Sequence, residues 1–239
     1  MTTQEFSNEF DVLYNNIMSN QAPGLNEYEK SVFLTKAQNE ILKNYFNPKG
    51  NKYQEGFDGS AKRQIDFSKI TVTKTLRSTT DASYGKIYGR SALYEFPDDV
   101  FIVINETISF TDSSPLMVVP IAYDEYMVYM TKPYKYPIKS QAWRILNSGT
   151  SSRLIEVITP KTLTGSTYTI RYIKTPSPIV LTDLNDNFSE LSINGVNTIT
   201  DCELDEILHP EILQRAVELA KAAYVGDVTS TVELGQRSE

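Results

Sequence analysis

Two segments near the N-terminus carry apolar residues at the spacing of an α-helix. In the first segment these residues recur every three or four positions and share one stripe: Phe6, Phe10, Leu13, Tyr14 and Ile17. A polar run that contains Pro23 and Gly24 then interrupts the pattern. The sequence therefore predicts a first amphipathic helix that ends before this break.

The second segment begins with a helix-capping signal. Asn26 stands three residues before Glu29, a variant of the capping box in which Asn replaces Ser or Thr. Apolar residues continue on one face as far as Asn47 and Pro48, where proline ends a helix. A short loop between two amphipathic helices favours an antiparallel helical hairpin.

After residue 50 the pattern changes to that of β-strands. Short runs rich in β-branched and aromatic residues alternate with turn residues. The runs cover residues 64–76, 100–110, 142–146, 154–159 and 166–174. A regular spacing of about 8–12 residues is typical of an antiparallel sandwich or barrel.

The last part of the chain returns to helical spacing. Residues 183–200 are polar, and Asn194-Gly195 predicts a small hairpin within this loop. Pro210 suits the first turn of a helix that continues to Tyr224 and ends at Gly226. The predicted fold class is α+β: residues 1–50 and 200–239 form an antiparallel helical bundle from both termini. Residues 51–199 form an inserted β-rich domain, an antiparallel sandwich or barrel.

Composition and charge exclude several classes of protein. The 239 residues contain one cysteine and one histidine, which excludes an intrachain disulfide and a metal site with several histidines. No apolar run is long enough to span a membrane, and the first residues lack the pattern of a signal peptide. The net charge of −7 is uneven: −3 for residues 1–46, +5 for 47–182 and −9 for 183–239.

Motifs for catalysis and for cofactors are missing from the sequence. His209 precedes Pro210 at a helix start, and Cys202 lies between acidic neighbours that raise a thiol pKa. A calcium-like run begins at Asp183 but places Phe188 where the loop needs glycine. No phosphate-binding glycine loop or nucleophile elbow is present. We therefore expect a protein that is not an enzyme and has no catalytic residue, metal or cofactor.

Residues 123–137 have the most unusual composition, with five tyrosines and two lysines. Tyrosine and lysine together can stack on and neutralise single-stranded nucleic acid. The same tyrosines can instead fill a half-buried surface or a contact between subunits, where tyrosine is enriched. The net charge of −7 favours this second interpretation, because nucleic acid is also negatively charged.

Three blocks of the sequence resemble one family of tailed-phage proteins. They are residues 9–38, with Ala22-Pro23-Gly24; residues 123–144, with Lys132-Pro133-Tyr134; and residues 208–224, with Leu208-His209-Pro210. The chain resembles head–tail connector or adaptor proteins, also called tail tubular protein A, and is most similar to ring proteins of crAss-like bacteriophages.

The resemblance implies a structural virion protein without an active site. In this family a helical bundle carries an inserted β-domain, and the copies form a ring, usually dodecameric, that connects the portal and head to the tail. The ring extends the channel through which DNA leaves the head, and DNA passes without sequence-specific binding. The expected partners are further copies of the chain, the portal protein and a neighbouring tail or ring protein, with no membrane. The expected location is the virion, assembled in the host cytoplasm.

Other functions remain as alternatives. A β-rich binding module for nucleic acid or glycan would use the aromatic residues at 123–137, and a hydrolase would use the acidic clusters. Within the connector interpretation, the chain can be the first adaptor under the portal or a later ring.

A ring also needs two complementary surfaces on each copy. We expect one surface to consist of tyrosines with neighbouring lysines: Tyr126, Tyr129, Tyr134 and Tyr136 with Lys132, Lys135 and Lys139. We expect these lysines to meet acidic residues of the next copy: Asp201, Glu203, Asp205 and Glu206.

Overall fold

The computed structural model describes residues 1–17, 24–46, 65–79, 91–110, 113–132, 134, 141–148, 153–159, 166–185 and 191–225. The chain divides into two compact units. Residues 1–70 and 176–239 form the first, which we call the helical unit. Residues 71–175 form the second, which we call the β unit.

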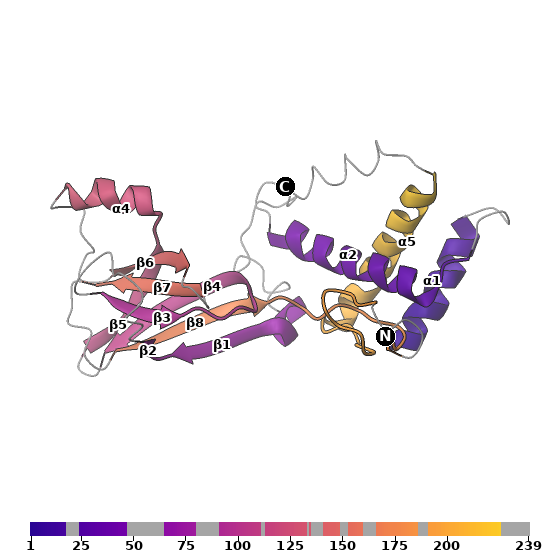
Figure 1. Ribbon diagram of the computed structural model, residues 1–239, viewed down its shortest axis with the longest axis horizontal. Helices are drawn as coiled ribbons and strands as arrows, with labels where there is room; N and C mark the ends of the chain where they lie inside the picture. The colour runs from indigo at the N-terminus through magenta and orange to yellow at the C-terminus, as the bar shows by residue number, and fades with distance from the viewer. Residues whose placement is uncertain are drawn as a thin grey trace. The chain divides into compact units, whose positions relative to one another are not determined.

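The strands described in the β unit form one eight-stranded sheet (Figure 1). They are β1 (Thr71–Leu76), β2 (Ser78–Thr79), β3 (Ala92–Glu95), β4 (Val100–Phe110), β5 (Ser113–Pro120), β6 (Gln141–Ser148), β7 (Arg153–Ile158) and β8 (Thr167–Lys174). Their order across the sheet is β1-β8-β4-β5-β6-β7-β3-β2. β1 and β2 lie at opposite edges of the sheet, yet only Arg77 separates them in sequence, so the sheet curls into a half-barrel.

The inner face of this half-barrel holds the main apolar core. Alternate residues of β8 point into it, and Tyr168, Ile170 and Tyr172 are fully buried. The register between β4 and β8 shifts at two places along β4, and such bulges bend a strand. The alternation of apolar residues and the bulges together give the sheet its curl.

The sheet is mixed, which corrects the prediction of an antiparallel sandwich or barrel. β5 and β6 pair in parallel, with Met117 opposite Gln141 and Pro120 opposite Arg144. Neighbouring parallel strands need a crossover connection, because a tight turn reverses the chain direction. This crossover contains helix α4 (Tyr123–Met130), so part of the tyrosine-rich stretch belongs to a β-α-β unit.

The helical unit contains three α-helices, α1 (Thr3–Ile17), α2 (Glu27–Phe46) and α5 (His209–Val225), among its described residues. Two short turns of 3-10 helix, η2 (Ser68–Ile70) and η4 (Glu206–Leu208), belong to the same unit. α5 packs against both α2 and α1. In Figure 1, α2 runs across the directions of α1 and α5. The prediction of an antiparallel helical bundle from both termini is therefore wrong.

A polar stripe on α2 explains why this helix does not join an antiparallel bundle. Ser31, Thr35 and Gln38 share one buried face of the helix. Thr35 Oγ1 accepts a hydrogen bond from the Ile179 N–H at 3.1 Å, and Gln38 Nε2 donates to the Ser177 carbonyl at 2.9 Å. An extended segment of the chain therefore occupies a face of α2 that a bundle would give to another helix.

Several local predictions are confirmed. The Glu29 N–H donates to Asn26 Oδ1 at 2.8 Å and the Asn26 N–H donates to Glu29 Oε2 at 2.9 Å, which completes the capping box. Asn194 and Gly195 both have positive φ, 50° and 82°, at the turn of a small hairpin. Pro210 lies in the first turn of α5.

Candidate interaction surfaces

Helix α4 packs its inner face on the sheet through tyrosines. Tyr126 is 4% exposed and lies in a cluster with Trp143, Ile145 and Ile158. The rings of Tyr129 and Trp143 are tilted, with centroids 5.8 Å apart. Two of the tyrosines that we predicted at a subunit contact thus bury their area mainly within their own chain.

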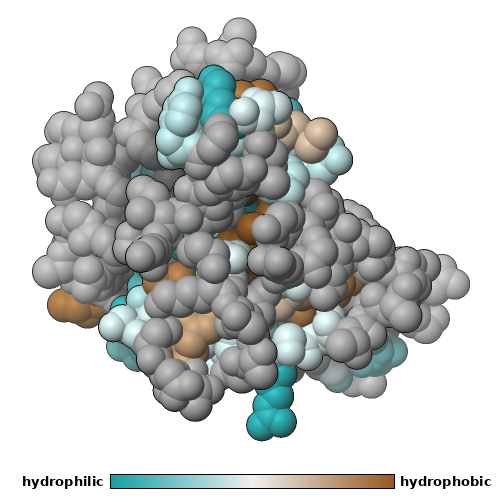
Figure 2. Space-filling view, turned by 90° about the vertical axis from the view of Figure 1, so that its left-hand side faces the viewer, coloured by the Kyte–Doolittle hydropathy of each residue, from teal (hydrophilic) through white to brown (hydrophobic). Residues whose placement is uncertain are grey.

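The outer face of α4 is apolar as well, although it meets solvent. Tyr123, Met127 and Val128 are 55%, 53% and 51% exposed. Asp124 and Glu125 are exposed beside them. Figure 2 views the molecule from the left-hand side of Figure 1. In the upper part of that view, at the height of α4 in Figure 1, hydrophilic and hydrophobic side chains lie next to each other. Sequence reasoning missed the helix, but two signals for it were present: the acidic first turn and apolar residues three and four positions apart.

The chain that follows α4 places a cation and an aromatic ring in solvent. The Lys132 N–H donates to the Tyr129 carbonyl at 3.0 Å, and the Lys132 side chain is exposed. Tyr134 is 84% exposed, the highest value among the large apolar and aromatic side chains described. The other predicted contact residues of this stretch, Lys135, Tyr136 and Lys139, lie outside the described residues.

The four predicted acidic contact residues lie in the segment that precedes α5. The Asp205 carboxylate caps η4 by accepting from the Ile207 N–H at 3.2 Å, and it lies 3.6 Å from Lys69 Nζ. These two groups, the backbone N–H first, lower the pKa of Asp205.

Glu203 also has a partner in its own chain, because its Oε2 accepts from the Ser177 N–H at 3.1 Å. Asp201 and Glu206 are exposed, and Asp201 Oδ1 accepts from the Thr3 N–H at 3.3 Å. Two of the four carboxylates thus serve the fold of the helical unit, and two are more open to a partner.

Two apolar grooves open on the surface of the helical unit. The α1/α5 groove has a volume of about 410 Å³ and is lined by Glu9, Leu13, Pro210, Leu213, Gln214, Val217 and Glu218. The α2 groove has a volume of about 340 Å³ and is lined by Tyr14, Leu25, Tyr28, Glu29, Val32, Phe33, Ala220 and Ala223. Grooves of this size hold a small organic group or a side chain of a partner.

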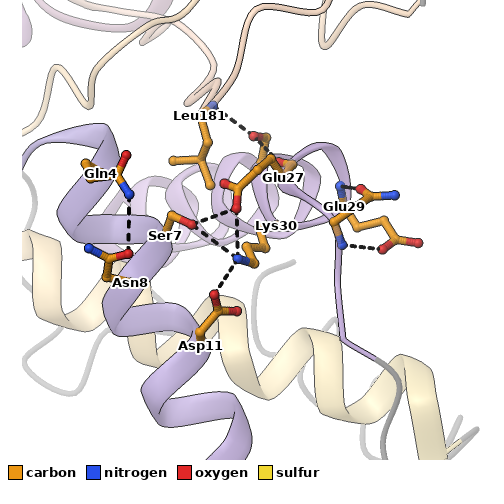
Figure 3. A network of polar contacts seen from close by, with 10 residues as sticks. Gln4, Ser7, Asn8, Asp11, Glu27, Glu29, Lys30 and Leu181 are labelled. Carbon is orange, nitrogen blue, oxygen red and sulfur yellow. Dashed lines mark hydrogen bonds and ion pairs between the residues drawn. The ribbon is translucent and has the colours of Figure 1, made fainter. Parts of the chain in front are cut away.

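A buried lysine joins α1 to α2 (Figure 3). Lys30 is 3% exposed, and its Nζ lies 2.7 Å from Asp11 Oδ2, 3.0 Å from Glu27 Oε1 and 3.1 Å from Ser7 Oγ. Burial alone would lower the pKa of Lys30, but the hydrogen bonds to Asp11 and Glu27 outweigh it and raise the pKa. The three contacts use all three ammonium protons, so the lysine is a structural group.

The β unit encloses a second ion pair. Arg144 Nε donates to Glu106 Oε2 at 2.9 Å, and the two side chains are 11% and 3% exposed. Burial raises the pKa of Glu106, although Arg144 opposes this shift. Because both side chains are buried beside the core of the half-barrel, a solute has little access to them, and the pair has the surroundings of a structural contact.

His209 and Cys202 have structural surroundings, as the sequence predicts. His209 is 3% exposed, its Nε2 donates to the Leu204 carbonyl at 3.2 Å, and its Nδ1 lies 2.8 Å from the Met1 amino group. Cys202 Sγ donates to Gln38 Oε1 at 3.4 Å, and burial raises the pKa of the Cys202 thiol to about 11. A thiol with this pKa is a poor nucleophile at neutral pH.

Comparisons with known proteins give the class of the chain. The family described as phage tail ring protein 3/4 matches residues 1–232. The chain belongs to this family. It is 54% identical to Ring protein 4/5 of Bacteroides phage crAss001 over 239 residues, the full length of both chains. It is also 32% identical to Ring protein 3 of the same phage over 227 residues, 92% of this chain and 95% of the relative.

The ring-protein family confirms the resemblance drawn from the three sequence blocks. The chain is a structural ring protein of a crAss-like phage and a component of the virion. Among the described residues, no group of three or more His, Cys, Asp or Glu side chains is arranged to hold a metal ion. The helices described are also too short or too polar to cross a membrane.

Proposed function

We propose that this ring protein forms a closed homo-oligomeric ring, a dodecamer, that connects the head to the tail of the virion. Membership of the ring-protein family carries the proposal. A ring of identical copies uses heterologous contacts, so each copy needs two different and complementary surfaces. The chain offers an exposed aromatic and cationic surface after α4 and acidic, apolar surfaces on the helical unit.

Within the virion, the chain acts as a later ring and not as the first adaptor under the portal. The relatives support this position by their names, which number them 3 and 4/5, and by the higher identity, 54% against 32%, to Ring protein 4/5. Its neighbours along the axis are then other ring or tail proteins, with the portal protein above the stack.

The ring extends the channel through which DNA leaves the head. The net charge of −7 supports passage without binding, because affinity for duplex DNA depends on clustered positive charge that releases counterions. The isolated full-length protein should therefore bind duplex DNA weakly. Tight and salt-sensitive binding would instead favour a nucleic-acid module.

Native mass spectrometry of the full-length protein tests the ring directly. The protein is mixed with the portal and the neighbouring ring proteins of the same phage, and the masses of the assemblies are compared with those of each component alone. We expect a complex that contains twelve copies of this chain. A single copy per complex, or no association at any concentration, would refute the proposed ring.

A further inference from the structure

The α1/α5 groove combines an apolar floor with negative charge at its rim. Leu13, Leu213 and Val217 supply apolar lining, and Glu9 and Glu218 add carboxylates. Both glutamates are exposed. A ligand that fits this groove therefore carries an apolar group and a cation close together.

Arg215 of α5 does not fully neutralise the negative charge at the rim of this groove. Arg215 lies 3.2 Å from Glu218 Oε2, but the same guanidinium also lies 2.7 Å from Glu40 Oε2. One arginine thus serves two carboxylates, and an excess of negative charge remains near the groove. Glu9, on α1, adds to this excess.

The α2 groove is a weaker candidate for a cationic ligand. Its only carboxylate among the lining residues is Glu29, whose Oε2 already accepts from the Asn26 N–H at 2.9 Å in the capping box. The two grooves therefore differ in charge although both are apolar.

The chain itself carries a group with the required chemistry. Lys132 and Tyr134 are two residues apart after α4, and both are exposed. A tyrosine ring supplies large contact area at low entropic cost, and a lysine two residues away lies within about 7 Å of it along the chain. Tyr134 fits the apolar floor, while Lys132 fits the carboxylates.

We propose that the α1/α5 groove receives the Lys132–Tyr134 segment of a neighbouring copy of this chain. The contact rests on the proposed ring, in which each copy carries both halves of one heterologous contact. Here the inserted half lies in the β unit and the receiving half lies in the helical unit. Charge complementarity favours a second copy, because Lys132 is cationic and the groove residues Glu9 and Glu218 are anionic. The acidic partner is thus this groove and not the carboxylates around η4.

Zero-length cross-linking of native phage particles tests the contact without any substitution. A carbodiimide joins a lysine amine directly to a carboxylate, and the covalent products are separated by denaturing electrophoresis before peptide mapping. We expect peptides that link Lys132 to Glu9 or Glu218 in the dimer and higher bands. Lys74 and Asp99, which lie 3.2 Å apart in one chain, provide an internal control, because their link should also occur in the monomer band.

A cysteine pair gives an independent measurement. Particles that carry Tyr134→Cys with Gln214→Cys should form a ladder of disulfide-linked multimers under mild oxidation. The matched control is Tyr134→Cys with Ala223→Cys, which places the second cysteine on the same helix but in the α2 groove. The first pair should give at least about tenfold more multimer, because a fixed neighbour raises the effective thiol concentration. Cys202 should contribute little, because its thiol pKa of about 11 leaves few thiolates at neutral pH.

The results separate this contact from the ring itself. If multimer bands contain Lys132 linked only to other carboxylates, or Lys132–Glu218 links occur only in the monomer band, the contact is refuted and the ring stands. If no covalent multimer forms and the particles contain no ring of this chain, both proposals are refuted. Equal multimer yields from the two cysteine pairs would also overturn the contact.

Discussion

Replacing Lys30 with methionine tests the polar network that joins α1 to α2. Methionine keeps an unbranched, apolar stem in the buried position but removes the ammonium group, which contacts Asp11 at 2.7 Å and Glu27 at 3.0 Å. A hydrogen bond to a charged group contributes about 1.5–3 kcal/mol. The loss is partly offset, because Lys30→Met also removes the desolvation cost of the buried ammonium. Asp11 and Glu27, which are 50% and 42% exposed, can in addition regain water.

We therefore expect Lys30→Met to lower the free energy of unfolding by about 1–3 kcal/mol. At a slope of about 2 kcal/mol per molar urea, the midpoint should fall by roughly 0.5–1.5 M. Circular dichroism at 222 nm follows the transition, because three of the four described α-helices belong to the helical unit. Lys36→Met is the matched control, since Lys36 is exposed on the same helix. If both variants have the wild-type midpoint, Lys30 does not hold the helices together.

Three further predictions test other parts of the structure. Burial, and then the nearby amino terminus, lower the pKa of His209; stability should therefore fall as the pH drops below about 6.5, where the unfolded state takes up a proton first. In urea titrations at several pH values, His209→Gln should reduce this fall in stability at low pH. A fall as large as that of the wild type would mean that His209 does not cause it. Gly195→Ala should lower the free energy of unfolding by about 1 kcal/mol or more, because φ at Gly195 is +82°, whereas Gly24→Ala should not. Equal urea midpoints for the two variants would mean that the backbone at Gly195 does not need glycine. Tyr126→Ala should lower the free energy of unfolding by about 2–4 kcal/mol and should shift the urea transition that Trp143 fluorescence follows to lower urea. An unchanged transition would mean that packing of Tyr126 does not stabilise α4 on the sheet.

The sequence predicted those features whose causes are local. The capping box at Asn26 and Glu29, the turn at Asn194-Gly195 and the helix start at Pro210 each depend on the backbone preferences of a few neighbouring residues. Such preferences act whatever the rest of the chain does.

Features that depend on distant partners were predicted wrongly. The apolar stripes predicted an antiparallel bundle. Instead, Thr35 and Gln38 on α2 hydrogen-bond to backbone groups that lie 144 and 139 residues further along the chain. The parallel pairing of β5 with β6 likewise depends on packing across the sheet, and no short sequence motif between the two strands predicts it.

The candidate contact residues show the same limit. Composition drew attention to residues 123–137, but it cannot tell which side of a helix faces the sheet. The structure turns Tyr126 inward and leaves Tyr123, Met127 and Tyr134 exposed. Glu9 and Glu218 belong to different helices that meet only in the fold, so neither stands out in the sequence.

Cryo-electron microscopy of intact phage particles measures the central claim most directly. A reconstruction of the region between head and tail, with the symmetry determined from the images, should contain a closed ring of twelve copies of this chain around an open channel. In that ring the β unit of each copy should contact the helical unit of the next. A reconstruction that lacks this chain in the region, or that shows it as single copies or an open spiral, would contradict the account.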